Sequence, residues 1–120
     1  MVCIMVVEDE SAIRETLVEF IQDAGYQIIE APSADIALGL IGDPRVRLLV
    51  TDINLPGRHD GIDLANEARK MHPGIPIVFI SGRPAKLIDA GVIQSPVALL
   101  QKPFSLFELM NTVNNMAVPG

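Results

Sequence analysis

The chain has 120 residues, of which 49% are hydrophobic, so it is long enough for one domain with a buried core and too short for two. We therefore expect a single domain over residues 1–120. The net charge of −6 argues against direct binding to nucleic acid, because contacts with phosphates need clustered Lys and Arg.

The amino-terminal stretch has no membrane signal. Met1–Val7 is apolar, but it is far too short to span a bilayer and lacks the basic start of a signal peptide. Cys3 is the only cysteine, so an internal disulfide is impossible, and we interpret it as a buried, inert thiol. These features favour a cytoplasmic protein with no membrane partner.

Alternating strand and helix patterns follow from the amino end. Val2–Val7 is predicted to be a strand buried on both faces, and it runs directly into acidic residues. Ser11 is predicted to cap a helix over Ala12–Ala24, which Gly25 ends. This helix is expected to bury an apolar face made of Ile13, Leu17, Phe20, Ile21 and Ala24.

A second strand and helix come next. The strand is predicted over Tyr26–Ala31, and Pro32-Ser33 starts a helix that Gly42-Asp43-Pro44 ends. The apolar residues of this helix at helical spacing are Ile36, Ala37, Leu40 and Ile41.

The third strand is the apolar run that begins at Val46 and leads to Asp52. In a parallel sheet the carboxyl end of a strand lies at the edge where ligands bind, so Asp52 is a candidate for chemistry. Pro56-Gly57 follows at once, and Asp52 taken alone is more readily explained as the start of that turn.

The remaining elements repeat the alternation. A third helix is predicted from Asp60-Gly61 towards Met71, then a strand over Ile75–Ile80 that ends at Ser81. Arg83–Ser95 is only weakly helical. The last elements are a strand over Val97–Leu100, followed by Lys102, and a helix capped by Ser105 that buries Leu106, Leu109, Met110 and Val113 and fades from Met116 to Gly120.

Five strands that alternate with helices predict an α/β fold, a parallel sheet with helices on both faces. Glu8-Asp9, Asp52, Ser81 and Lys102 would then meet at one edge of that sheet. Carboxylates gathered there repel one another unless a cation lies between them. Their oxygen ligands suit Mg²⁺ better than zinc, for which the chain has no Cys or His cluster.

Lys102 and Ser81 supply a positive charge and a hydroxyl donor, both of which suit phosphate oxygens. A carboxylate such as Asp52 can accept a phosphoryl group as an aspartyl phosphate, with Mg²⁺ and Lys stabilising the charge. The two histidines, His59 and His72, fall in predicted loops, and we interpret both as solvated surface residues without a role.

The chain resembles the receiver domain of two-component response regulators over essentially its whole length. The residues that carry the resemblance are Val6-Val7-Glu8-Asp9, Thr51 to Gly57, Asp60-Gly61, Ile80-Ser81-Gly82 and Lys102-Pro103-Phe104. Each is a weak signal, but their order and spacing together are specific. The resemblance implies a flavodoxin-like (βα)5 fold with strands in the order 2-1-3-4-5.

The resemblance also implies roles for the site residues. Asp52 would be the phosphoacceptor, modified by a histidine kinase or a histidine phosphotransfer protein, and Lys102 would contact the phosphoryl group through a loop with a cis Lys102-Pro103 bond. Asp9 and Asp52 would bind Mg²⁺ directly, Glu8 through water, and Asn54 through its backbone carbonyl. Such a domain is a signalling phosphoacceptor that takes part in its own phosphotransfer and autodephosphorylation, rather than an enzyme, and it acts on a downstream protein or an attached output domain.

Two positions depart from the commoner family pattern. The switch hydroxyl is Ser81 where Thr is more usual, and Leu99 stands where an aromatic residue is expected. We interpret Leu99 as an ordinary packing residue. Arg14 lies one turn into the first helix, and the resemblance implies that histidine-bearing partners dock near that end. We interpret Arg14 as solvated, as we do Glu10 and Glu15.

Two other functions fit parts of the pattern. An Mg²⁺-dependent phosphatase with an aspartyl nucleophile usually has a second aspartate two residues later as acid and base, and this chain has Asn54 there. Flavin binding on the same fold needs a phosphate loop rich in Ser, Thr and Gly after the first strand, where this chain has Glu8-Asp9-Glu10.

Overall fold

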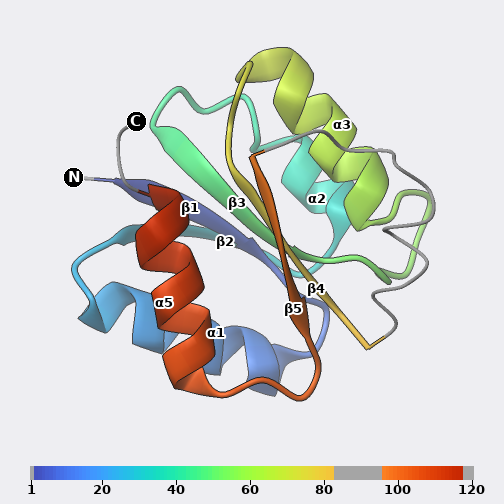
Figure 1. The fold of residues 1–120 in the computed structure, drawn as a ribbon. Coiled ribbons are helices and arrows are strands. Elements are labelled where there is room, and N and C mark those ends of the chain that lie inside the picture. Colours follow the sequence, from blue (N-terminus) through green and yellow to red (C-terminus); the bar gives the residue numbers. More distant parts are fainter. Residues whose placement is uncertain (1, 83–95, 118–120) are drawn as a thin grey trace.

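The structure is a computed structural model that describes residues 2–82 and 96–117 (Figure 1). The helix weakly predicted over Arg83–Ser95 lies outside the described residues. The elements are β1 (Cys3–Val7), α1 (Ser11–Asp23), β2 (Gln27–Ala31), α2 (Ala34–Leu38), β3 (Val46–Asp52), α3 (Gly61–Met71), β4 (Ile77–Ser81), β5 (Val97–Gln101) and α5 (Leu106–Ala117).

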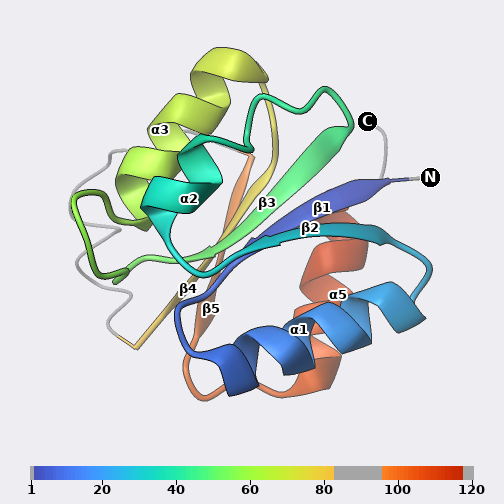
Figure 2. The same ribbon diagram turned by 180° about the vertical axis from the view of Figure 1, so that it is seen from behind.

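The five strands form one parallel sheet in the order β2-β1-β3-β4-β5, which confirms the topology predicted from the sequence. Helices α1 and α5 cover one face, and α2 and α3 cover the other (Figures 1 and 2). Because every strand runs in the same direction, all five carboxyl ends lie at one edge of the sheet. None of the helices in the described part of the chain is long and apolar enough to cross a bilayer.

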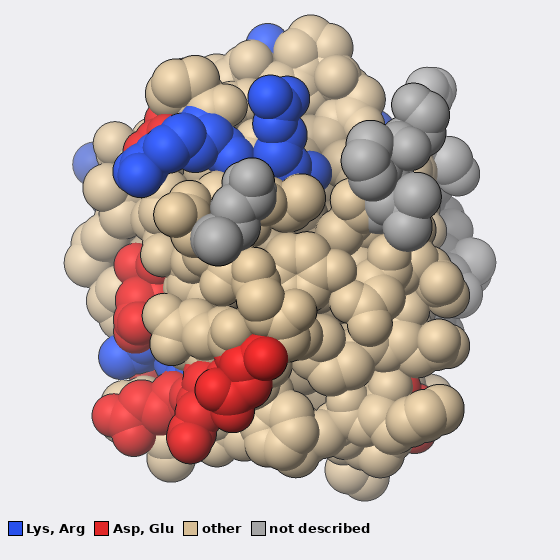
Figure 3. Space-filling model, turned by 90° about the vertical axis from the view of Figure 1, so that its left-hand side faces the viewer, with Lys and Arg blue, Asp and Glu red and all other residues tan. Residues whose placement is uncertain are grey.

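Charged side chains are unevenly spread over the surface near the chain termini. In the face shown in Figure 3, acidic side chains gather in its lower part and a smaller group of basic side chains lies above them. This face therefore has no continuous basic surface of the kind that tracks a nucleic acid backbone.

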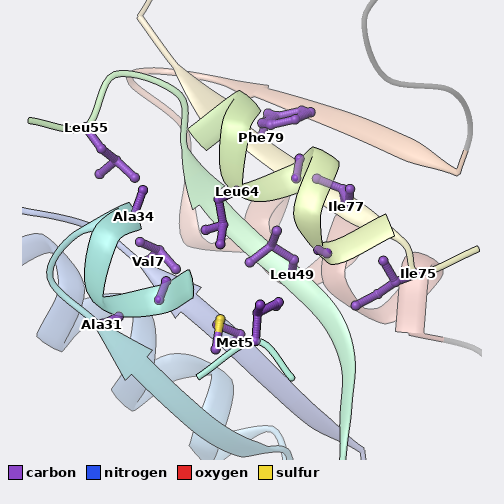
Figure 4. Packing of buried hydrophobic residues seen from close by; sticks show 14 of the residues in the cluster. Met5, Val7, Ala31, Ala34, Leu49, Leu55, Leu64, Ile75, Ile77 and Phe79 are labelled. Carbon is purple, nitrogen blue, oxygen red and sulfur yellow. The ribbon is translucent and has the colours of Figure 1, made fainter. Parts of the chain in front are cut away.

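The core consists of two apolar clusters, one on each side of the sheet. Alternate residues of a strand point to opposite faces, so Met5 and Val7 pack under α2 and α3, while Ile4 and Val6 pack under α1 and α5. Figure 4 shows the first cluster, in which Phe79 is completely buried. Removal of one such side chain costs about 2–5 kcal/mol of unfolding free energy, so these clusters hold the strand ends in place.

The start and the buried face of α1 differ from the prediction. Glu10 rather than Ser11 occupies the N-cap position, and no side chain caps the helix there. Phe20, predicted to be buried, is 40% exposed, and Ala24 is exposed as well. The buried stripe of α1 consists of Leu17, Val18 and Ile21, so it is rotated towards Val18 from the face that the apolar residues suggested.

Helix α2 is shorter than predicted. Ser33 caps it as expected, because its Oγ accepts a hydrogen bond of 3.1 Å from the Ile36 backbone N–H. The helix ends at Leu38, and the chain continues through tight turns, in which Leu40 N–H donates to the Ala37 carbonyl. Ile36 is 52% exposed, so of the predicted apolar face only Ala37 and Ile41 reach the core. By contrast, Ser105 caps α5 as predicted, and Leu109 and Val113 are buried while Leu106 and Met110 are half-buried.

The end of β3 is held by the beginning of α3. Gly61 N–H donates to the Ile53 carbonyl at 2.9 Å, and Asp60 caps the helix in a capping box with Asp63. A Cβ atom on Gly61 would lie 2.1 Å from the backbone oxygen of Asp52. Only glycine therefore allows α3 to approach Asp52 this closely.

We expect Gly61→Ala to lower the free energy of unfolding by about 3 kcal/mol, because backbone must shift to admit the methyl group. Urea denaturation measures the loss. Gly42→Ala is the matched control, since a Cβ there would meet its nearest neighbour, Met71 Sδ, at an ordinary 3.6 Å. Equal stability of the two variants would contradict the close approach.

Candidate functional site

The edge at the carboxyl ends of the strands brings the predicted acidic residues together. Glu8 and Asp9 follow β1, and Asp52 ends β3. One carboxylate oxygen from each of the three residues lies within 4.8 Å of the others. Glu8 and Asp52 are buried, at 2% and 6% exposure, whereas Asp9 is exposed. The edge therefore holds a cluster of three acids, the acidic pocket, in which two carboxylates are buried and one is exposed.

Lys102 joins this cluster from the residue after β5. Its Nζ donates a 2.7 Å hydrogen bond to Asp52 Oδ2 and lies 3.5 Å from Glu8 Oε1. Partial burial acts to lower the pKa of Lys102, but the hydrogen bond and charge of Asp52, supported by Glu8, raise that pKa overall. Lys102 is thus a fixed ammonium in contact with Asp52. The Lys102-Pro103 bond is cis, as predicted.

Glu8 is a buried carboxyl group whose pKa is shifted strongly upward. Its burial and the neighbouring charge of Asp52 raise the pKa of Glu8 to about 7, although Lys102 opposes this rise. Oε2 accepts a hydrogen bond of 3.0 Å from Asp9 N–H, whereas Oε1 is buried and has no hydrogen-bond partner among the described residues. A buried carboxylate oxygen without a donor is a site that a cation can satisfy.

The backbone around Asp52 is held on both sides. Asn54 N–H donates to Asp52 Oδ1 at 3.1 Å, and Ile53 N–H donates to the Ile80 carbonyl of β4 at 3.0 Å. Asp52 Oδ2 faces Lys102, so each carboxylate oxygen has one fixed partner. The proposed role of the Asn54 backbone carbonyl as a metal ligand stays a prediction.

Ser81 lies at the same edge, as the sequence predicted. It is the last residue of β4, and its side chain is buried. Its carbonyl accepts a hydrogen bond of 2.9 Å from Lys102 N–H, so the backbones of Ser81 and Lys102 are directly joined. All the predicted site residues thus come together, from segments that are far apart in the sequence.

Three residues outside the strand ends, which the sequence predicted to be solvated, make contacts with other parts of the chain. Arg14, interpreted from the sequence as solvated, is only 16% exposed and donates a 2.7 Å hydrogen bond to the Glu8 carbonyl. His72 was also interpreted as solvated, but it is half-buried and its Nε2 donates to the Ile41 carbonyl at 2.6 Å. Neither contact has a sequence signal, because both acceptors are backbone oxygens. His59, 44% exposed, is a surface residue as predicted, with its Nδ1 2.7 Å from Asp35 Oδ1.

Residues predicted to have no part in the site also have defined places. Glu10 and Glu15 are exposed, as predicted. Leu99 is half-buried and packs against the cluster beneath α2 and α3, which agrees with an ordinary packing role. Cys3 is buried, as predicted.

Residues 4–114 match the family described as the response regulator receiver domain. The chain belongs to this family. Membership accounts for the flavodoxin-like fold, and it makes the chain a phosphoacceptor signalling module of two-component systems, whose members bind Mg²⁺ in their acidic pocket and work with histidine kinases and output domains.

Similar proteins include members of quite different length. The response regulator receiver protein CpdR of Brucella abortus is 31% identical over 116 residues, which is 96% of each chain. The sensor kinase CckA of the same organism is 35% identical over 94% of this chain, but this chain spans only 12% of that protein. The crystal structure of the receiver domain of NtrX from Brucella abortus is 33% identical, covers 98% of this chain and 99% of its own, and has a TM-score of 0.85.

The acidic pocket of this receiver domain fits a hard divalent cation. Glu8, Asp9 and Asp52 offer only oxygen ligands, and no Cys or His of the described residues belongs to the cluster. Glu8 Oε1 is in an ion pair with Lys102 Nζ at 3.5 Å but accepts no hydrogen bond among the described residues, so such an ion, or water bound to it, can satisfy it.

We expect the metal-free protein to lose stability as pH rises from 4.5 to 7. In this range native Glu8, with its pKa raised to about 7, binds more protons than the unfolded chain, so the free energy of unfolding falls by about 1–3 kcal/mol. Urea denaturation in EDTA measures this slope. Glu8→Gln should remove the dependence, whereas Glu15→Gln, at an exposed position, should retain it. Equal slopes for Glu8→Gln and wild type would contradict the assignment.

Proposed function

We propose that this receiver domain accepts a phosphoryl group on Asp52, in the presence of Mg²⁺, from a phosphohistidine of a histidine kinase or a histidine phosphotransfer protein. The observation that carries the proposal is the 2.7 Å contact between Lys102 Nζ and Asp52 Oδ2 within a pocket of three carboxylates. A carboxylate held beside a fixed ammonium is prepared to become an acyl phosphate whose oxygens that ammonium neutralises.

In the proposed reaction, a carboxylate oxygen of Asp52 attacks the phosphorus atom. The bond between phosphorus and the donor imidazole nitrogen breaks, and its electron pair stays on the imidazole. Lys102 then transfers its hydrogen bond from Asp52 to a phosphoryl oxygen, and Ser81 supplies a hydroxyl donor to another. Asn54 N–H keeps Asp52 oriented through its second oxygen.

The bound Mg²⁺ would neutralise charge on the transferring oxygens. We assign Asp9 and Asp52 as its direct ligands, Glu8 as a ligand through water, and Asn54 as a ligand through its backbone carbonyl. The proximity of the three carboxylates supports this set, as does Glu8 Oε1, which accepts no hydrogen bond among the described residues.

The phosphatase alternative is less well supported. A phosphatase of this kind needs an acid two residues after its nucleophile to protonate the leaving group, and Asn54 cannot do this. We therefore propose a phosphoacceptor that hydrolyses its own acyl phosphate slowly rather than an enzyme with multiple turnover. Its single-domain extent over residues 1–120, its cytoplasmic location, and the absence of membrane or nucleic acid partners stay predictions.

Labelling with a small phosphodonor tests the acceptor. Wild type with Mg²⁺ and acetyl phosphate should gain one base-labile phosphoryl group, measured by intact mass, and Asp52→Asn should gain none. Lys102→Ala should be labelled at least tenfold more slowly, because the transition state loses a charged donor. Asp43→Asn changes a carboxylate outside the pocket and should be labelled like wild type.

Labelling of Asp52→Asn to the wild-type level would refute the assignment of the acceptor. Repeated turnover of a general phosphate ester by wild type would favour the phosphatase instead.

The switch can be followed by NMR with a beryllofluoride mimic of the phosphoryl group. We expect large shifts at Ser81, which lies beside Lys102, and little rotamer change at Leu99, which packs against the core. Leu99 has no polar group that would gain from moving into water. A large change in the Leu99 methyl couplings would contradict this expectation.

A further inference from the structure

Arg14 is half-buried on the side of α1 that contacts the acidic residue Glu8. It lies three residues before Leu17 and four before Val18, on the stripe that this helix buries, and its side chain is only 16% exposed. Its Nη1 donates to the Glu8 carbonyl at 2.7 Å, and its Nε donates to Glu30 Oε1 of β2 at 3.2 Å. One guanidinium therefore connects α1, the end of β1 and β2.

The contact with Arg14 holds the backbone of Glu8, in the acidic segment Glu8-Asp9 that follows β1. Glu8 N–H donates to the Ala31 carbonyl of β2 at 3.2 Å, and the Glu8 carbonyl accepts from Arg14, so both backbone groups of Glu8 are held. Asp9 N–H in turn donates to the Glu8 carboxylate. The orientation of both acids therefore depends on the backbone of Glu8.

No side chain caps the start of α1, which follows the turn after β1. The N-cap residue of α1, Glu10, makes no capping hydrogen bond through its side chain. In the absence of a cap, the guanidinium of Arg14 is the side chain that ties the first turn of the helix to the end of β1. Lysine is a poor replacement, because its one nitrogen cannot occupy the positions of both Nε and Nη1, from which the planar guanidinium donates.

We propose that Arg14 is a positioning residue of the phosphorylation site, which holds the backbone of Glu8 so that Glu8 and Asp9 present their carboxylates to Mg²⁺. The proposal rests on the proposed function of that pocket. Arg14 acts through the Glu8 carbonyl, and its charge is directed to Glu30 on the far side of the turn. Outer groups of this kind typically change metal affinity by about tenfold or more when they are removed.

Direct titration of Mg²⁺ by NMR separates this role from general stability. Arg14→Gln should raise the dissociation constant for Mg²⁺ about tenfold, while labelling by acetyl phosphate at saturating Mg²⁺ stays within about twofold of wild type. In the metal-free protein, hydrogen exchange at the Asp9 N–H should accelerate. Arg14→Lys keeps the charge and should retain most of the defect, and it serves as the test variant if Arg14→Gln does not fold.

Arg69 provides a matched control at the opposite edge of the sheet. This arginine also donates to two backbone carbonyls, those of Ile75 and Pro96, each at 2.7 Å, before β4 and β5. Arg69→Gln should lower stability and leave the Mg²⁺ dissociation constant unchanged. Glu30→Gln removes the ion pair but keeps the Glu8 contact, and it should change that constant less than twofold.

The outcomes distinguish this proposal from the proposed function. An Arg14→Gln dissociation constant within twofold of wild type, or an equal rise for Arg69→Gln, would overturn the role of Arg14 while Asp52 labelling stands. Full rescue by Arg14→Lys would show that charge rather than position matters, which also overturns it. Failure of wild type to bind Mg²⁺ and to be labelled would overturn the proposed function itself, and the role of Arg14 with it.

Discussion

The site is governed by the crowding of carboxylates at the edge of the sheet. Glu8, Asp9 and Asp52 lie within 4.8 Å of one another, and Lys102 is the cation in contact with them among the described residues. With all four groups ionised, three negative charges and one positive charge leave −2, the charge that a divalent cation matches. Burial and the charge of Asp52 raise the pKa of Glu8, because protonation of Glu8 relieves the same repulsion.

The fold makes this crowding possible at a tolerable cost in stability. Parallel strands bring residues 8, 52, 81 and 102 to one edge, and two apolar clusters hold the strands from both sides. Gly61 lets α3 contact the end of β3, so Asp52 cannot move away from its neighbours. The carboxylates stay together because the hydrogen bonds of the sheet and the packing of α3 at Gly61 hold the backbone that carries them.

The sequence predicts the sheet well and the helices less well. The strands β1, β4 and most of β3 are apolar runs that end at polar residues, so their existence and terminal residues such as Asp52 could be predicted. The order of the strands in the sheet came from the resemblance to the receiver family. Helix faces depend on packing: Phe20 is apolar yet 40% exposed, and Arg14 is charged yet half-buried. The interpretation of Arg14 and His72 as solvated was wrong, because each donates to a backbone carbonyl. Every residue has such a carbonyl, so no sequence pattern marks these acceptors.

Lys102, which contacts the proposed phosphoacceptor Asp52, also joins the site to the sheet. Lys102 is bonded to Asp52 through its side chain and to the Ser81 carbonyl through its backbone. A phosphoryl group on Asp52 would take the side-chain bond, so the ammonium must move while the backbone bond keeps β4 and β5 together. The displacement would then be taken up by the Lys102 side chain and by Ser81 at the end of β4. Leu99, three residues before Lys102, packs against the core and has no polar group that the phosphoryl group would attract.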